Sequence, residues 1–124
     1  MTADDFREIA LAMPGAVEGA HMGHPDFRIN GRIFATLHAD HRTGMVKLPP
    51  EEQRVCIESH PGVFEPSSGA WGRQGCTNLR LAAADAATAR GAMLLAWQAA
   101  VAKSAERGRT ARRAPSGSRG GKRR

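Results

Sequence analysis

The chain has 124 residues, of which 41% are hydrophobic and 5% aromatic, and this length suits one domain with a modest core. No apolar run is long enough to cross a bilayer, so no membrane-spanning segment is expected. The net charge of +6 is unevenly divided. Residues 1–102 hold nine basic and eleven acidic side chains, a net of −2, whereas residues 103–124 hold nine basic side chains and one acid, a net of +8. This division indicates a nearly neutral body with a basic tail.

The start of the chain and its cysteine content indicate a compartment. The first residues, Met-Thr-Ala-Asp-Asp-Phe, are acidic and lack a signal-peptide pattern, so we expect a cytoplasmic protein. Cys56 and Cys76 are too few for a disulfide framework, and in a reducing cytoplasm both are expected to be small, mostly buried thiols.

The first predicted element is a helix. It begins after Thr2, whose hydroxyl suits the N-cap position, and ends before Pro14-Gly15. Its apolar side chains recur on one helical face: Phe6, Ile9, Ala10 and Met13. From residue 16 the period changes, and a strand is possible over residues 16–22.

Asn30-Gly31 predicts a tight hairpin, because both turn positions favour a positive φ. A two-residue loop pairs Ile29 with Arg32 and Phe27 with Phe34. Both faces of such a hairpin carry apolar groups, so the pattern leaves open which face is buried.

The remaining elements follow from proline, acid and period signals. Pro49-Pro50-Glu51-Glu52 starts a helix that runs to about Ser59, and Asp85 caps a last helix. Residues 61–75, rich in Gly, Pro and Ser, are expected to form a long irregular connection. Strands are predicted over residues 26–29, 32–37, 45–48 and 77–81.

The C-terminal part of the chain has a different composition. From residue 105 it consists mainly of Arg, Gly, Ser, Thr and Pro, which cannot bury enough apolar area to offset chain entropy. We therefore expect a domain over residues 1–103 and a disordered basic tail over residues 104–124. The order α-β-β-β-α-β-α, with hairpin-linked strands, predicts an α+β domain in which helices pack on an antiparallel β-sheet.

Five short segments occur in an order shared with a known family. They are Met13-Pro14-Gly15-Ala16, the run from His24 to Ala35, the run from Val46 to Glu51, the run from Gly69 to Gly75, and Ala96-Trp97. Over residues 3–103 this arrangement resembles the MmcQ/YjbR family. The resemblance implies an α+β fold similar to the CyaY (frataxin-like) arrangement, and no catalytic residues come with it. Some members have been proposed to bind DNA through two protruding β-hairpin wings. At Cys76 the family often has an aromatic residue, which argues against a stacking role there.

Two groups of residues have spacings that occur in metal or catalytic sites. The His-x-x-His pairs at residues 21–24 and 38–41 can share a metal in a loop, with a cysteine completing a zinc sphere. Because no Cys-x-x-Cys accompanies them, turn and solvated roles are favoured, and we expect no metal and no cofactor. Cys56 and His60 stand four residues apart on the second predicted helix, as a nucleophile and its base would. No third group orients His60, so a structural thiol is favoured and no enzymatic activity is expected.

The segment from Trp71 to Gly75 is the best candidate for a recognition loop. Its glycines permit a sharp turn, while the indole of Trp71 and the guanidinium of Arg73 are groups that stack on bases or hold phosphate. In the alternative interpretation, Trp71 folds inward over the sheet and the glycines serve only the turn.

Further candidates for phosphate contacts are arginines. Arg28 and Arg32 flank the tip of the predicted hairpin, although the net charge of −2 on the body weakens the wing interpretation and a solvated sheet edge is the alternative. The tail attracts phosphate polyanions with a steep salt dependence, or serves only as a solubilising extension. Its candidates are Arg107, Arg109, Arg112 and Arg113, followed by Arg119, Lys122, Arg123 and Arg124.

The sequence therefore predicts a small, non-catalytic protein that binds nucleic acid, first of all DNA, weakly and in a salt-sensitive way. The basic tail supplies most of the electrostatic affinity, and no membrane partner is expected. The alternative is an adaptor that binds a protein or small ligand through the Trp71–Arg73 loop.

Overall fold

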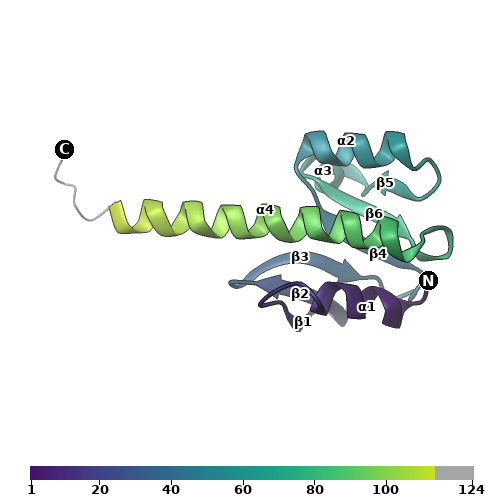
Figure 1. The fold of residues 1–124 in the computed structure, drawn as a ribbon, viewed down its shortest axis with the longest axis horizontal. Helices are drawn as coiled ribbons and strands as arrows, with labels where there is room; N and C mark the ends of the chain where they lie inside the picture. Colours follow the sequence, from purple (N-terminus) through teal and green to yellow (C-terminus); the bar gives the residue numbers. More distant parts are fainter. Residues whose placement is uncertain (114–124) are drawn as a thin grey trace.

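The computed structural model describes the backbone of residues 1–113 and the side chains of residues 1–106. Within these residues, a six-stranded antiparallel sheet in the order β1-β2-β3-β4-β6-β5 carries four α-helices (Figure 1), which confirms the predicted α+β class. The strands are β1 Val17–His21, β2 His24–Ile29, β3 Arg32–Leu37, β4 Thr43–Lys47, β5 Phe64–Pro66 and β6 Cys76–Arg80. The helices are α1 Ala3–Leu11, α2 Pro50–Ser59, α3 Gly69–Arg73 and α4 Ala86–Arg113, the last preceded by a 3-10 turn at Leu81–Ala83.

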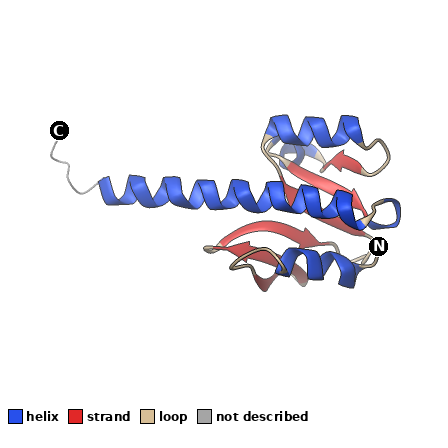
Figure 2. Cartoon of the chain, in the orientation of Figure 1, coloured by secondary structure: helices blue, strands red, loops and turns tan. Residues whose placement is uncertain are grey.

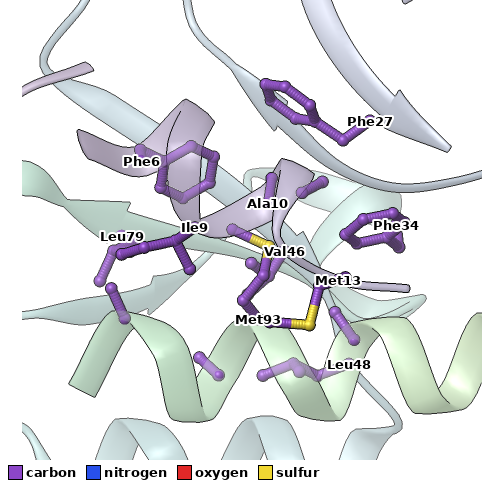
Figure 3. Packing of buried hydrophobic residues seen from close by; sticks show 14 of the residues in the cluster. Phe6, Ile9, Ala10, Met13, Phe27, Phe34, Val46, Leu48, Leu79 and Met93 are labelled. Atoms are coloured by element: carbon purple, nitrogen blue, oxygen red, sulfur yellow. The ribbon is translucent and has the colours of Figure 1, made fainter. Parts of the chain in front are cut away.

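Helices α1 and α4 pack on the sheet and on each other, and they close the main core. Helix α4 lies against β2, β3 and β4, and α1 lies against β3 and β4, while α2 and α3 pack beside β5 and β6 (Figure 2). Figure 3 shows the buried side chains that meet between these layers, with Phe6 and Ile9 from α1, Phe34 from β3 and Met93 from α4. The ring of Phe6 meets that of Phe27 edge to face, with centroids 6.2 Å apart.

Helix α1 begins as its sequence predicts. Thr2 and Asp5 form a reciprocal capping box, in which the backbone N–H of Asp5 donates to Thr2 Oγ1 and that of Thr2 donates to Asp5 Oδ2. The loop after α1 is fixed from a distance, because the indole Nε1 of Trp97 donates to the Pro14 carbonyl at 2.9 Å.

Two tight turns shape the β1–β2–β3 meander. Asn30 and Gly31 have φ values of 54° and 77°, which confirms the predicted hairpin. Met22 and Gly23 form a second turn of the same kind, with φ values of 53° and 81°. This turn makes the possible strand over residues 16–22 the real edge strand β1.

The pairing of β2 with β3 differs from the prediction at one position. Ile29 does pair with Arg32, but Phe27 lies opposite Ala35 rather than Phe34, because a β-bulge interrupts the register. The bulge allows two consecutive residues of β3, Phe34 and Ala35, to be fully buried. The buried face of the hairpin, which the sequence left open, is the face that carries Phe27 and Ile29, since both are buried together with Phe34 and Ala35.

The connection over residues 61–75 was predicted to be irregular throughout, but it contains strand β5 and helix α3. Phe64 pairs with Leu79 and is buried, which draws this segment onto the sheet as an edge strand. Gly72 and Gly75 then permit close backbone contacts. A Cβ atom at Gly72 would overlap the Ser67 carbonyl oxygen, and one at Gly75 would overlap that of Leu48.

Helix α4 begins after Asp85, as predicted, but it continues to Arg113, ten residues past the boundary predicted at 103. The reason is composition: residues 102–113 contain one Gly and no Pro, and they are mostly Ala, Arg, Lys and Glu, which favour helix. The predicted disordered tail therefore starts as a helical extension in its first part. Its remainder, residues 114–124, lies outside the described residues.

Candidate nucleic-acid interface

Cationic side chains from three elements surround one hollow at an end of the sheet. Arg32 opens β3, Lys47 ends β4 and Lys103 lies on α4, and all three line a hollow of about 190 Å³. Among the described residues, no acidic side chain lines it. The rest of its wall includes Gln74 and an apolar floor to which Leu48, Ala96 and Ala100 contribute.

These cations differ from most other basic residues of the domain in having no internal counter-ion. Within the described residues, ion pairs involve Arg7, Arg28, Arg54 and Arg80. None involves Arg32, Lys47, Lys103 or the nearby Arg73 in that part of the chain. Within the described residues, no ion-paired acid therefore neutralises the positive charge of these four side chains.

Arg28, one of the two hairpin arginines, is engaged inside the protein. Its Nε and Nη2 donate to the two carboxylate oxygens of Asp26 at 2.8 and 2.9 Å, and Asp26 is completely buried. These hydrogen bonds and the charge of Asp26 raise the pKa of the Arg28 guanidinium. On the neighbouring strand, a Cβ at Gly19 would come within 2.9 Å of Asp26 Oδ1, so the glycine leaves room for the pair. The first role of Arg28 is thus to hold a buried carboxylate.

Arg32, the second hairpin arginine, has the opposite environment. Its Nε atom is buried, and among the described residues it has no hydrogen-bond acceptor. A buried donor without a partner is unusual in folded proteins and is commonly satisfied by water or a ligand. Within the described residues, no internal hydrogen bond of this Nε therefore competes with an incoming anion.

Trp71 does not fold inward over the sheet. It lies on α3 with 67% of its surface exposed, so the alternative in which it serves as a lid is wrong. Arg73 is exposed at the end of the same helix, directly before Gln74, which lines the hollow. An exposed indole and an exposed guanidinium thus lie on the helix that directly precedes a residue of the hollow.

The helical extension of α4 carries four of the arginines that were predicted for the tail, and the other four cations lie outside the described residues. Arg107, Arg109, Arg112 and Arg113 follow Lys103 along the same helix, and their side chains lie outside the described residues. Figure 1 shows the β2–β3 turn and the extension of α4 at the same end of the molecule. The basic extension therefore projects from the end of the domain at which the hairpin turn lies (Figure 1).

Lys47 and Lys103 belong to this site although the sequence does not single them out. Each is an exposed lysine near the end of a regular element, which is an ordinary position for a solvated charge. Only the arrangement of β3, β4 and α4 shows that they share a hollow with Arg32.

Three of the four histidines in the two His-x-x-His pairs lie at a different place. His21 and His24 face each other across the Met22-Gly23 turn, and with His38 they line a second hollow of about 500 Å³. The loop beyond it is fixed by Asp40, which accepts hydrogen bonds from the backbone N–H groups of Arg42 and Thr43. Within the described residues, no group of three His, Cys, Asp or Glu side chains is arranged to hold a metal ion.

Cys56 and His60 do not form an activated pair. The imidazole of His60 packs edge to face against Phe64, with ring centroids 5.9 Å apart. Burial, together with the charge of Glu52, raises the pKa of the Cys56 thiol. Both observations argue against a nucleophilic thiolate at this position. Burial likewise raises the pKa of Cys76, which is a buried thiol as predicted.

Comparisons with known proteins agree with the fold. A family model described as YjbR matches residues 11–98, which is more than half of the chain. The crystal structure of Deinococcus radiodurans protein DR2400, described with the domain DUF419, is similar with a TM-score of 0.65 and 17% identity. The match covers 77% of this chain and 75% of that one. No curated protein matches the sequence. None of the described helices has the length and apolar character needed to span a membrane.

Proposed function

We propose that this chain, which belongs to the YjbR family, binds nucleic acid through phosphate contacts around the hollow of Arg32, Lys47 and Lys103, at the end of the domain from which α4 projects (Figure 1). The binding is weak, sensitive to salt and without catalysis. Family membership establishes the fold and not this activity, so the proposal rests on the charges of this chain.

The observation that carries the proposal is the clustering of cations without counter-ions. Arg32, Lys47 and Lys103 share one hollow, and Arg73 directly precedes Gln74, which also lines it, while residues 1–102 as a whole have a net charge of −2. A surface that concentrates positive charge on a nearly neutral body creates a local field that attracts polyanions. The sequence carries a net charge of +8 in residues 103–124.

The two sets of cations serve different steps. The basic extension supplies long-range attraction, which needs no defined side-chain geometry and releases counter-ions from the nucleic acid. The residues around the hollow supply short-range phosphate contacts that orient the protein on the strand. Trp71, exposed on α3, offers a face on which a base of a single strand stacks.

One observation favours a second candidate function. Trp71 is exposed, and tryptophan and arginine are both enriched among the residues that contribute most to protein–protein binding. The alternative is therefore an adaptor that binds a protein or small ligand through Trp71 and Arg73. In that case nucleic acid does not bind, or binds without any dependence on the basic extension.

A titration of labelled duplex and single-stranded DNA at low salt tests the proposal. We expect the full chain to bind both, and the double substitution R107Q/R109Q to weaken duplex binding by about tenfold at moderate salt. The matched control is R42Q/R90Q, which removes two exposed arginines that line other hollows. Equal weakening by the two variants, or no binding by the full chain at low salt, would contradict the proposal.

A further inference from the structure

We infer that the hollow between Arg32, Lys47 and Lys103 binds a terminal phosphate group, that is, a phosphate monoester at the end of a strand. The inference deepens the proposed function and rests on it for the identity of the ligand. It concerns a defined cavity, whereas the general attraction of nucleic acid concerns the whole basic end.

The charge of the hollow fits a dianion. Its three cations come from three separate elements, and no acid lines it among the described residues. The acids nearest to these cations in sequence are Glu51 and Glu52, which start helix α2, and Glu106, three residues after Lys103 on α4. None of the three lines the hollow, Glu51 is bound by Arg54, and no ion pair joins Glu106 to Lys103 in the described part of the chain. A phosphate monoester carries a charge of roughly −1.5 to −2 near neutral pH, whereas an internal phosphodiester carries only one negative charge. The monoester therefore gains more from three converging cations.

The hydrogen bonding of Arg32 is consistent with an acceptor that a bound ligand supplies. Its Nε lacks a hydrogen-bond partner in the described part of the chain, unlike that of Arg28 on the adjacent strand. Turning the guanidinium toward the hollow breaks no internal hydrogen bond. Once the guanidinium has turned, an anion in the hollow accepts from a donor that the described residues leave without a partner.

The size and floor of the hollow favour an end group over an internal segment. At about 190 Å³ it is smaller than the roughly 300–1,000 Å³ of pockets that enclose a whole small molecule. It suits a phosphate with part of its sugar, lying against the apolar floor of Leu48, Ala96 and Ala100. An internal phosphodiester must leave the hollow along two chain directions, whereas a terminal phosphate leaves along one.

The test compares single-stranded oligonucleotides of one sequence with a 5′-phosphate, a 3′-phosphate or hydroxyls at both ends. We expect the full chain to bind one phosphorylated form about tenfold more tightly, as one added set of charge-assisted hydrogen bonds implies. The double substitution K47Q/K103Q reduces this preference to within about twofold, because it removes two of the charges that hold the phosphate. Both lysines are exposed, so the variant remains folded. The control R42Q/R90Q retains the preference.

The outcomes separate this inference from the proposed function. Equal affinity for the phosphorylated and hydroxyl forms, with binding still salt-sensitive, overturns the inference and leaves the proposed function intact. If no oligonucleotide binds, the proposed function fails. Calorimetric titration with adenosine monophosphate and with inorganic phosphate then shows whether the hollow binds a phosphate group at all. Binding of either that is lost in K47Q/K103Q and kept in R42Q/R90Q supports a phosphate site for a free ligand. Absence of binding overturns it.

Discussion

Arg28 and Asp26 lie two residues apart on β2 and form a two-point ion pair, with Nε–Oδ1 and Nη2–Oδ2 distances of 2.8 and 2.9 Å. Their spacing places both side chains on the same side of the strand, and the carboxylate is completely buried whereas the guanidinium is about one-third exposed. The pair is therefore a structural element of the hairpin, and it distinguishes Arg28 from Arg32.

The substitution R28A is expected to lower the Tm by roughly 5–10 °C, because it leaves a buried carboxylate without its counter-ion. The partial exposure of the guanidinium keeps the effect below that of a fully buried pair. Differential scanning calorimetry measures it. D26N/R28A loses both charges and is expected to be more stable than R28A alone, while R42A, at an exposed loop position, changes the Tm little. A Tm for R28A equal to that of R42A would contradict the structural role.

Substitution of glycine by alanine is expected to change the stability of the domain in opposite directions at Gly75 and Gly91. Gly75 has a φ of 103° and its Cβ would overlap the Leu48 carbonyl oxygen, so G75A is expected to destabilise the domain by more than about 2 kcal/mol. Gly91 lies within α4 with no atom near its Cβ position, so G91A is expected to stabilise it by about 0.5–1 kcal/mol. Urea denaturation of both variants gives the comparison. A loss of stability in G91A, or none in G75A, would disagree with the contacts described.

The boundaries that the sequence predicts well are those set by local chemistry. Thr2 and Asp85 cap helices through their own side chains, and Asn30-Gly31 forms a turn through its own φ values. These signals need no distant partner, so the sequence contains them. Strand β5 is different. Phe64 joins the sheet only because Leu79 is available beside it, which is information from fifteen residues away.

The candidate site was only partly predictable for the same reason. The sequence shows that Arg28 and Arg32 are both charged. It does not show that Asp26 binds Arg28, or that the Nε of Arg32 has no hydrogen-bond partner among the described residues. The bulge that changes the pairing of β3 is likewise set by packing of Phe34 into the core. Exposure of Trp71 depends on α3, a helix for which the Gly-rich segment gives little signal.

The stability of the domain is expected to decrease in acid partly through Asp85. The backbone N–H of Thr88 donates to its carboxylate, which lowers the pKa of Asp85. Because the folded pKa lies below the unfolded value of about 4, this contribution is present above about pH 4 and is lost as the pH falls through the folded pKa. Asp5 and Asp40, whose pKa values are also lowered by backbone hydrogen bonds, act in the same direction.

Thermal unfolding of D85N as a function of pH isolates this effect. Asn also caps helices well, so the variant is expected to unfold near the wild-type Tm at about pH 7 or slightly below it. Between about pH 4 and pH 2 the wild type is expected to lose more stability than D85N, since the amide does not titrate. Parallel Tm curves over that range would show that Asp85 contributes nothing to the acid sensitivity.

Substitution of the exposed tryptophan distinguishes base stacking from a passive surface position. W71A is expected to leave the Tm almost unchanged, because the side chain is mostly exposed. It is expected to weaken single-strand binding by roughly 1–3 kcal/mol and duplex binding by much less, because only unpaired bases offer a face for stacking. W71F serves as the control that retains an aromatic ring. An equal loss on duplex and single strand would argue against stacking.

The central claim, that cations at one end of the molecule bind phosphates, is tested most directly by the salt dependence of duplex binding. The logarithm of the association constant is measured against the logarithm of salt concentration for the full chain and for R107Q/R109Q/R112Q/R113Q. Each phosphate contact contributes about −0.9 to the slope on duplex DNA, so the account predicts a steep slope for the full chain and one shallower by about 2–4 for the variant. Parallel lines for the two proteins, or a full-chain slope near zero, would contradict it.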